Sequence, residues 1–342
     1  MARGDLLKQL FESYQNRDDK RFRAAAEEII EEERKKHHPV LSNELQRILA
    51  NGSRSLESAD ACSVGEPVPM DRERSSPLLL TRFPDRYFAD LVLTDRTLET
   101  FQRILREIRG WEILEANGLR PSRRLLFCGP SGCGKTAAAE AISTELGLPL
   151  LYVRFDSVVS SLLGETAANL RKVFEYAKRG QWVVFFDEFD AIGRSRDDAT
   201  EHGEIKRVVN SFLQLLDSFE GRSLLIAASN FEQVLDPAIW RRFDEVVRFD
   251  RPDQEALSRL LRLRLRPFQA EEEHLASLVE KLEGATFAEA ERACYDVRKR
   301  CVLEGRKGLS DEDMAQAVER FRYRRAILQK ASDTEELPRI DR

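Results

Sequence analysis

The stretch Gly129-Pro-Ser-Gly-Cys-Gly-Lys-Thr136 restricts the fold of this chain more than any other part of the sequence. It matches the spacing G-x-x-x-x-G-K-[ST], with a strand pattern over 124–128 before it and a helical pattern over 136–146 after it. In that setting the glycines let the backbone curl so that its N–H groups face phosphate oxygens, and the helix N-terminus adds partial positive charge. Lys135 should reach the β- and γ-phosphates of a nucleotide, and the Thr136 hydroxyl should bind Mg²⁺. The predicted phosphate site comprises Gly129, Pro130, Ser131, Gly132, Cys133, Gly134, Lys135 and Thr136.

Two carboxylates follow the apolar run Val183-Val-Phe-Phe186, at the strand end where a parallel sheet presents its ligand crevice. Asp187 is predicted to hold Mg²⁺, directly or through water. Glu188 is predicted to orient the attacking water or to accept its proton. Adjacent strand residues point to opposite faces, so this division of roles requires a bend of the backbone at the sheet edge.

A polar pair, Ser229 and Asn230, follows the apolar run 224–228. An amide at that strand end can hydrogen-bond the γ-phosphate and help to place the water, which makes Asn230 a candidate member of the same site. Taken alone, an asparagine after a strand is usually a turn former. The two neighbouring segments favour the catalytic interpretation.

Apolar runs of strand length alternate with helical patterns between residues 77 and 251. The alternation predicts an α/β fold, a doubly wound parallel sheet with helices on both faces. After Pro252 the pattern becomes helical, which predicts a small lid domain over 252–330 followed by a tail over 331–342. The predicted strands are 125–128, 149–153, 182–186, 224–227 and 245–249, and the predicted lid helices are 253–267, 271–283, 286–305 and 311–328.

Three stripes of apolar residues at helical spacing lie within residues 5–50. They predict an N-terminal helical bundle over 1–50, which we expect to recruit a partner. Residues 51–76 have few large apolar residues and many glycines, serines, prolines and charges, which predicts a flexible linker. The alternative is that this N-terminal part is a packed extension of the main domain.

Composition and charge exclude several classes of protein. A net charge of −5 disfavours a chain whose main task is to grip nucleic acid. The five cysteines show no C-x-x-C spacing, so a zinc site, a redox dithiol or a disulfide framework is not expected. The N-terminus lacks the apolar core of a signal peptide, and no run approaches the ~20 apolar residues that span a bilayer. We therefore expect a cytoplasmic protein.

Taken together, these segments resemble the AAA+ ATPases, specifically the AAA branch that includes protein-remodelling hexamers, over roughly residues 85 to 325. The phosphate loop is similar to the Walker A motif, VVFFDEFDAIG to Walker B, and AASN to sensor 1. The stretch LDPAIWRRFDE, residues 235–245, resembles the second region of homology of that branch, shortened by two residues between the arginines. Ala288 resembles the position at which this branch lacks a sensor-2 arginine.

The resemblance implies that Arg241 and Arg242 enter the site of a neighbouring subunit. A planar arginine cation stabilises the charge that spreads over a transferring phosphoryl group, and such an arginine finger contributes on the order of 10³-fold or more in rate. A head-to-tail contact of this kind closes into a ring if the rotation between neighbours is right, and the resemblance implies six subunits, a number that the sequence alone does not fix. The alternative is that both arginines are solvated loop cations.

One stretch departs from the family pattern. Members that thread polypeptides carry an aromatic residue before an apolar residue and a glycine, and the aromatic grips the substrate in the ring's pore. Here the possible pore loop reads Leu162-Leu163-Gly164, with Leu162 in the place of the aromatic. The residue before it, Ser161, is a serine and not a lysine. Leucine has apolar area but no flat ring, so weaker remodelling or a regulatory ATPase is favoured over processive unfolding.

Three functions are therefore open. The first is a ring-forming ATPase that exerts force on a protein partner. The second is a nucleotide-gated assembly switch that controls a partner enzyme, since some similar stand-alone bacterial AAA proteins accompany a subtilisin-like protease. The third, DNA remodelling, rests on the basic stretches 259–266 and 320–325, whose alternating arginines also fit helices that cover apolar surface. His37-His38 is interpreted as a solvated helix end rather than a metal site.

Overall fold

The computed structural model describes residues 8, 22, 24–26, 28, 67–71, 76–158, 163–189, 201–230, 237–268, 271–306 and 308–335. The chain divides into two compact units, Met1–Glu66 and Pro67–Arg342, and nearly all of the described residues belong to the second. The predicted bundle over 1–50, apart from isolated positions, and the pair His37-His38 lie outside the described residues.

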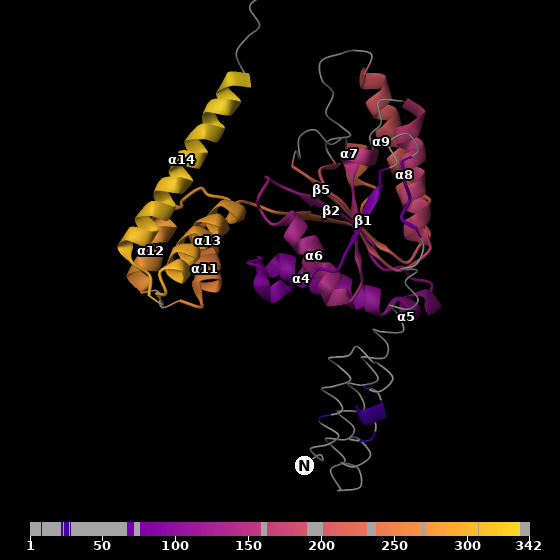
Figure 1. The fold of residues 1–342 in the computed structure, drawn as a ribbon. Coiled ribbons are helices and arrows are strands. Elements are labelled where there is room, and N and C mark those ends of the chain that lie inside the picture. The colour runs from indigo at the N-terminus through magenta and orange to yellow at the C-terminus, as the bar shows by residue number, and fades with distance from the viewer. Residues whose placement is uncertain are drawn as a thin grey trace, which may run out of the picture. The chain divides into compact units, whose positions relative to one another are not determined.

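A six-stranded sheet forms the centre of the second unit (Figure 1). Its order is β1-β3-β4-β5-β2-β6, and neighbouring strands are parallel except for β1 with β3. Each predicted strand is present, so the predicted α/β fold with a mostly parallel sheet is confirmed. The strands are β1 (Leu79–Arg82), β2 (Arg124–Cys128), β3 (Leu150–Val153), β4 (Val183–Phe186), β5 (Leu224–Ser229) and β6 (Glu245–Arg248).

The edge strand β1 is absent from the sequence-based prediction. Its four residues, Leu79-Leu-Thr-Arg82, are few and end in polar side chains, so their pattern does not distinguish a strand from a loop. The strand forms because its backbone pairs antiparallel with β3, where Leu80 lies opposite Tyr152. Whether residues 79–82 form a strand therefore depends on pairing with a segment that is distant in the sequence.

The packed part of the second unit begins within the stretch 51–76 that the sequence predicts to be a linker. The Asp71 carboxylate is buried and accepts a hydrogen bond from Asn169 Nδ2 at 3.1 Å. Lys172 Nζ donates to the carbonyl oxygen of Met70 at 3.1 Å. Both donors lie on one helix, so the chain is held against the α/β domain before residue 77, and the predicted linker boundary at 76 is too late.

Helices cover both faces of the sheet (Figure 1). On one face Phe185 packs in a buried cluster with Phe101 of α4 and Ile142 of α6. On the other face the Phe186 ring lies 5.5 Å from that of Phe174 in α8 and 5.1 Å from that of Phe212 in α9, measured between centroids. These helices are α4 (Asp95–Arg109), α6 (Lys135–Leu146), α8 (Leu163–Lys178) and α9 (Glu201–Asp217), and the shorter ones are η1 (Phe88–Asp90), α5 (Trp111–Ala116), α7 (Phe155–Val158) and α10 (Pro237–Trp240).

Four helices after the sheet form a separate hydrophobic core, as the sequence predicts for the lid (Figure 1, orange to yellow). Leu261, Leu278, Val297 and Phe321 are buried in it, one from each helix. The last helix continues past residue 328 into the expected tail, because no glycine or proline interrupts the chain before Pro338. The helices are α11 (Gln254–Leu265), α12 (Glu272–Lys281), α13 (Phe287–Leu303) and α14 (Asp311–Glu335).

Within the described part of the chain, no helix combines the length and the apolar character that crossing a membrane requires.

Candidate functional site

The predicted phosphate loop connects β2 to α6 and curls through three glycines in the left-handed half of backbone space. Gly129, Gly132 and Gly134 have φ angles of 137°, 76° and 100°. A Cβ atom on Gly129 would lie 1.9 Å from the carbonyl oxygen of Phe249, at the end of the neighbouring strand β6. The loop therefore needs glycine for its backbone conformation and, at residue 129, for space as well.

A cavity of about 400 Å³ opens beside this loop. It brings together the end of β4, the end of β5, the segment before α4, and two helices of the lid domain. Its lining includes most of the predicted site residues, namely Ser131, Gly132, Cys133, Gly134, Lys135, Thr136, Asp187, Glu188, Asn230 and Ala288. Gly129 and Pro130 contribute through their carbonyl oxygens, which hold Lys135.

Lys135 is buried at the floor of this loop, with 6% of its surface exposed. Its Nζ donates hydrogen bonds to the carbonyl oxygens of Gly129 (2.5 Å) and Pro130 (2.9 Å) and to Oδ1 of Asn230 (2.8 Å). Asn230 reaches the lysine because β5 lies beside β2, with Ser229 opposite Cys128. The sheet thus joins two predicted site residues that are far apart in the sequence.

Asp187 and Thr136 meet at the end of β4. The Thr136 hydroxyl donates to Oδ2 of Asp187 at 3.0 Å, and the backbone N–H of Glu188 donates to Oδ1 at 3.0 Å. A hydroxyl and a carboxylate placed together at a cavity wall are the oxygen ligands that a hard divalent cation prefers. These residues fit such a cation, in the pairing that the sequence predicts.

The structure adds Tyr152 to this group, a residue that the sequence indicates only as part of the predicted strand 149–153. Its hydroxyl donates to Oδ2 of Asp187 at 3.2 Å. Burial, together with the Asp187 charge, raises the pKa of Tyr152 to about 12, so the hydroxyl stays protonated at neutral pH. The one available signal was a polar atom in an otherwise apolar strand, and it becomes informative only when β3 is known to adjoin β4.

The bend that the sequence requires after β4 is present at Glu188. Its φ is 51°, and it is the one non-glycine residue with positive φ in the described part of the chain. Left-handed backbone at a residue with a side chain is strained and concentrates at functional sites. The bend allows two consecutive carboxylates, Asp187 and Glu188, to line the same cavity.

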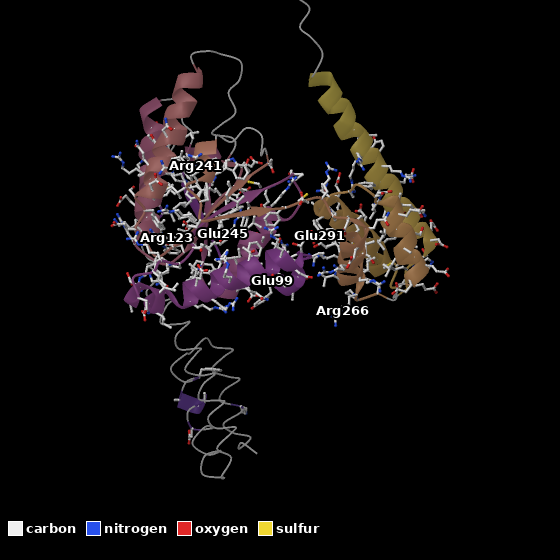
Figure 2. All side chains as sticks on the ribbon, turned by 180° about the vertical axis from the view of Figure 1, so that it is seen from behind. Glu99, Arg123, Arg241, Glu245, Arg266 and Glu291 are labelled. Carbon is white, nitrogen blue, oxygen red and sulfur yellow. The ribbon has the colours of Figure 1, made fainter. Side chains whose placement is uncertain are left out.

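The lid domain closes the other side of the cavity. The backbone N–H of Ala288, in the first turn of α13, donates to the carbonyl oxygen of Gly132 at 3.0 Å. Arg264 Nε pairs with Glu291 Oε1 at 2.6 Å, and Arg264 Nη2 donates to the carbonyl oxygen of Asp90 at 2.9 Å. Figure 2 shows Glu291 at the side of the lid that faces the sheet. Sequence reasoning missed Arg264, Glu291 and Asp90, because they belong to no motif.

Arg241 and Arg242 do not line this cavity, which separates them from the other predicted site residues. Both follow α10 and are exposed, and Figure 2 shows Arg241 well apart from Glu291 at the cavity's lid side. Arg242 Nη1 pairs with Asp217 Oδ2 at 2.6 Å, whereas no ion pair of Arg241 is seen among the described residues. The two neighbouring arginines therefore have different surroundings.

The possible pore loop lies mostly outside the described residues. Leu162 is not described, and Leu163 and Gly164 are described only as the first backbone positions of α8. The prediction about substrate grip at these positions stays a prediction.

Acidic partners accompany several arginines of the two basic stretches. Arg262 pairs with Glu272 at 2.6 Å, and Arg324 pairs with Asp296 at 2.8 Å. These ion pairs place acidic charge beside two of the arginines; the interpretation of the stretches as helices that cover apolar surface stays a prediction. The described residues also contain no cluster of three or more histidine, cysteine or acidic side chains suited to a metal.

Comparisons with known proteins agree with this geometry. Residues 125–251 match the family described as "ATPase family associated with various cellular activities (AAA)". An AAA family ATPase of Sinorhizobium fredii, y4kL, is 41% identical over 326 residues, 95% of this chain and 97% of that protein. A proteasome-activating nucleotidase of Methanocaldococcus jannaschii is 27% identical over 82% of this chain and 67% of its own length. The ATP-dependent zinc metalloprotease FtsH 3 of Sphaerobacter thermophilus is 31% identical over 80% of this chain, which spans 57% of that relative.

Proposed function

Since the chain belongs to the AAA family of ATPases, we propose that it forms a ring that couples ATP hydrolysis to remodelling or regulation of a protein partner. Membership makes the chain an ATP hydrolase that binds its nucleotide with a divalent metal. The identity of the metal as Mg²⁺, the ring, the cytoplasmic location and the partner are parts of the proposal. The names of two relatives, a proteasome-activating nucleotidase and a metalloprotease, connect those proteins to protein breakdown.

Within one subunit we assign five residues to nucleotide and metal. Lys135 binds the β- and γ-phosphates, and Thr136 with Asp187 holds Mg²⁺. Glu188 activates the attacking water, and Asn230 contacts the γ-phosphate and helps to place that water. What supports these roles is that all five side chains line one cavity, although they come from three separate segments of the chain.

The observation that carries the ring is the position of Arg241. It is an exposed cation outside the cavity of its own subunit, close in sequence to a strand end that lines the cavity. An arginine placed there is available to complete the phosphate site of another copy of the chain. Such a contact is head-to-tail, and it closes into a ring when the rotation between neighbours allows it; we propose a ring of six subunits.

The different surroundings of the two arginines support different roles for them. Arg242 forms an ion pair with Asp217 of its own chain. Arg242 would have to break this ion pair before it could contact a phosphate in a neighbouring subunit. Arg241 carries no such restraint among the described residues. We therefore assign the finger to Arg241 and a supporting, intramolecular position to Arg242.

Mixing variants tests the shared site. Glu188→Gln and Arg241→Ala should each lose ATP turnover, the second by on the order of 10³-fold. In a mixture, the cavity of an Arg241→Ala subunit beside a Glu188→Gln neighbour regains a complete set, so turnover should partly recover. The matched control replaces Glu188→Gln by the double variant Glu188→Gln/Arg241→Ala, which should rescue nothing.

Two results would contradict the proposal. One is a mixture that co-assembles, as followed by fluorescence transfer between labelled subunits, but recovers no turnover. The other is an Arg242→Ala variant that loses as much turnover as Arg241→Ala while keeping its assembly.

A second candidate is the assembly switch, in which ATP binding holds a partner enzyme on or off and hydrolysis resets it. The leucine at the predicted pore position, Leu162, favours this function, because it lacks the ring that grips a threaded chain. A subtilisin-like protease stays a predicted partner. The two functions differ in a reconstituted assay with the Glu188→Gln variant, which should bind ATP without hydrolysing it. If the chain is a switch, this variant should already change the activity of the partner enzyme. If the chain remodels its partner, the variant should have no effect, because remodelling requires turnover.

A further inference from the structure

The hydroxyl of Tyr152 is placed where apolar packing does not require it. Tyr152 lies in β3 between the buried residues Leu151 and Val153, and its ring packs 5.8 Å from that of Phe185, between centroids. A phenylalanine would fill the same space. The hydroxyl instead reaches Oδ2 of Asp187 at 3.2 Å, on the neighbouring strand's end.

Asp187 consequently accepts three hydrogen bonds in a fixed arrangement. Thr136 and Tyr152 both donate to Oδ2, and the backbone of Glu188 donates to Oδ1. Two of these donors are members of the predicted site, and their positions change if the loop or the bend moves. Tyr152 belongs to neither segment, because it lies on β3, which is paired with β1 on one side and β4 on the other.

The Tyr152 ring also has a cationic neighbour. Arg82, at the end of β1, places its guanidinium carbon 4.2 Å from the centroid of the ring. The two residues are diagonal neighbours across the β1–β3 pair, since Leu80 lies opposite Tyr152. A cation over the ring face is attracted to it and restricts its movement. A chain of contacts thus runs from Arg82 through Tyr152 to Asp187.

We propose that Tyr152 is a positioning residue that fixes the Asp187 carboxylate for the metal of the ATP site, and that Arg82 holds the tyrosine ring in place. The inference rests on the proposed role of Asp187 with Mg²⁺. Partners that orient a metal-binding side chain typically contribute a factor of about 10 to 100 in metal affinity or activity. Tyr152 therefore acts on the cation and leaves the binding of the phosphates themselves to the loop.

The test separates metal affinity from nucleotide affinity and from stability. Binding of a fluorescent ATP analogue is measured in EDTA and then against Mg²⁺ concentration, for the full-length wild type and for Tyr152→Phe. The Mg²⁺ concentration at half-saturation should rise about tenfold in Tyr152→Phe. The affinity in EDTA and the thermal unfolding temperature should not change. Arg82→Ala should shift the Mg²⁺ dependence in the same direction by a smaller factor.

Tyr323→Phe is the matched control, because it removes an exposed phenolic hydroxyl from α14 and should leave every reading unchanged. An unaltered Mg²⁺ dependence in Tyr152→Phe overturns the proposal, and so does a loss of affinity in EDTA that equals the loss in Mg²⁺. If Tyr152→Phe does not fold, the proposal is tested with Arg82→Ala, by the same measurements of Mg²⁺ dependence and of affinity in EDTA. A wild type whose ATP binding ignores Mg²⁺ would instead overturn the proposed metal site, and the inference with it.

Discussion

At the scale of single residues, backbone conformation decides which side chains serve the phosphate site. Gly129 has no room for a Cβ atom, because the carbonyl of Phe249 occupies that space. Glu188 does carry a side chain in left-handed backbone, which is unfavourable by roughly 1–2 kcal/mol. The strain is compensated by packing on either side, where Phe186 and Phe189 are both buried. The bend is thus enforced by the core.

Asp313 shows how a single buried carboxylate makes the lid sensitive to pH. Its side chain is fully buried and accepts hydrogen bonds from two nitrogens of Arg306 at 2.8 Å and from the Ser310 hydroxyl at 2.7 Å. These donors, Arg306 first, hold the pKa of Asp313 well below its ordinary value. The folded lid therefore keeps this carboxylate charged at a pH where the unfolded chain protonates it.

We predict that this carboxylate stabilises the lid in a pH-dependent way. A carboxylate whose pKa is lower in the folded chain stabilises the folded state. This stabilisation is complete at pH values above the pKa in the unfolded chain, about 4 for aspartate, and it is lost as the pH falls below that value. Asp313→Asn should unfold a few degrees below the wild type at pH 7, and the difference should narrow toward pH 3. Thermal melts followed by circular dichroism measure both, and a difference that is constant across this range would contradict the role.

At the scale of elements, the lid contacts the phosphate loop through the N-terminal end of α13. Thr286 caps this helix, and Ala288 donates its N–H to Gly132. A Cβ atom on Gly132 would lie 2.9 Å from Thr286 Oγ1 and 3.2 Å from Ala288 Cβ. The helix can approach the loop because residue 132 has no side chain.

Gly132→Ala should therefore push α13 away from the loop. Gly134→Ala is the control, since residue 134 also has positive φ but has nothing within 4 Å of an added Cβ. Both variants bear the backbone strain, about 1–2 kcal/mol. Only Gly132→Ala should speed amide hydrogen exchange at Ala288, by tenfold or more, in the absence of nucleotide. Equal protection of that amide in the two variants would mean that the contact is not what closes the lid.

At the scale of the whole molecule, the proposed catalytic set is incomplete in one chain. The cavity is lined by the residues that we propose for the phosphates, the metal and the attacking water, while Arg241 lies outside it. Glu188 and Arg241 can then act on one nucleotide only across a contact between copies. Assembly and turnover should be linked by mass action.

ATP turnover per chain should consequently fall on dilution. The wild type should approach the residual rate of Arg241→Ala, lower by on the order of 10³-fold, as light scattering shows the assembly to dissociate. The variant itself should turn over at a rate that does not depend on concentration. A wild type that keeps its full rate as a dissociated monomer would end the shared-site proposal.

Much of the fold follows from local patterns. The runs that form β4 and β5 are apolar throughout, and they indicate buried parallel strands before any partner is known. The strand β1 and the contacts of residues 67–71 could not be predicted in this way, because they depend on pairing with distant segments. The end of α14 was predicted too early, since its polar last turns carry no apolar stripe.

The sequence by itself determined which residues we propose for the phosphates and the metal: Gly129 to Thr136, Asp187, Glu188 and Asn230. Their spacing reflects chain geometry that is local: a loop between a strand and a helix, or a polar residue at a strand end. Only the tertiary structure decided that Tyr152 contacts Asp187 and Arg82 contacts Tyr152, that Arg264 and Glu291 line the cavity, and that Arg241 stays outside it. Those relations depend on strand order and helix packing, which bring together residues whose separation along the chain carries no signal.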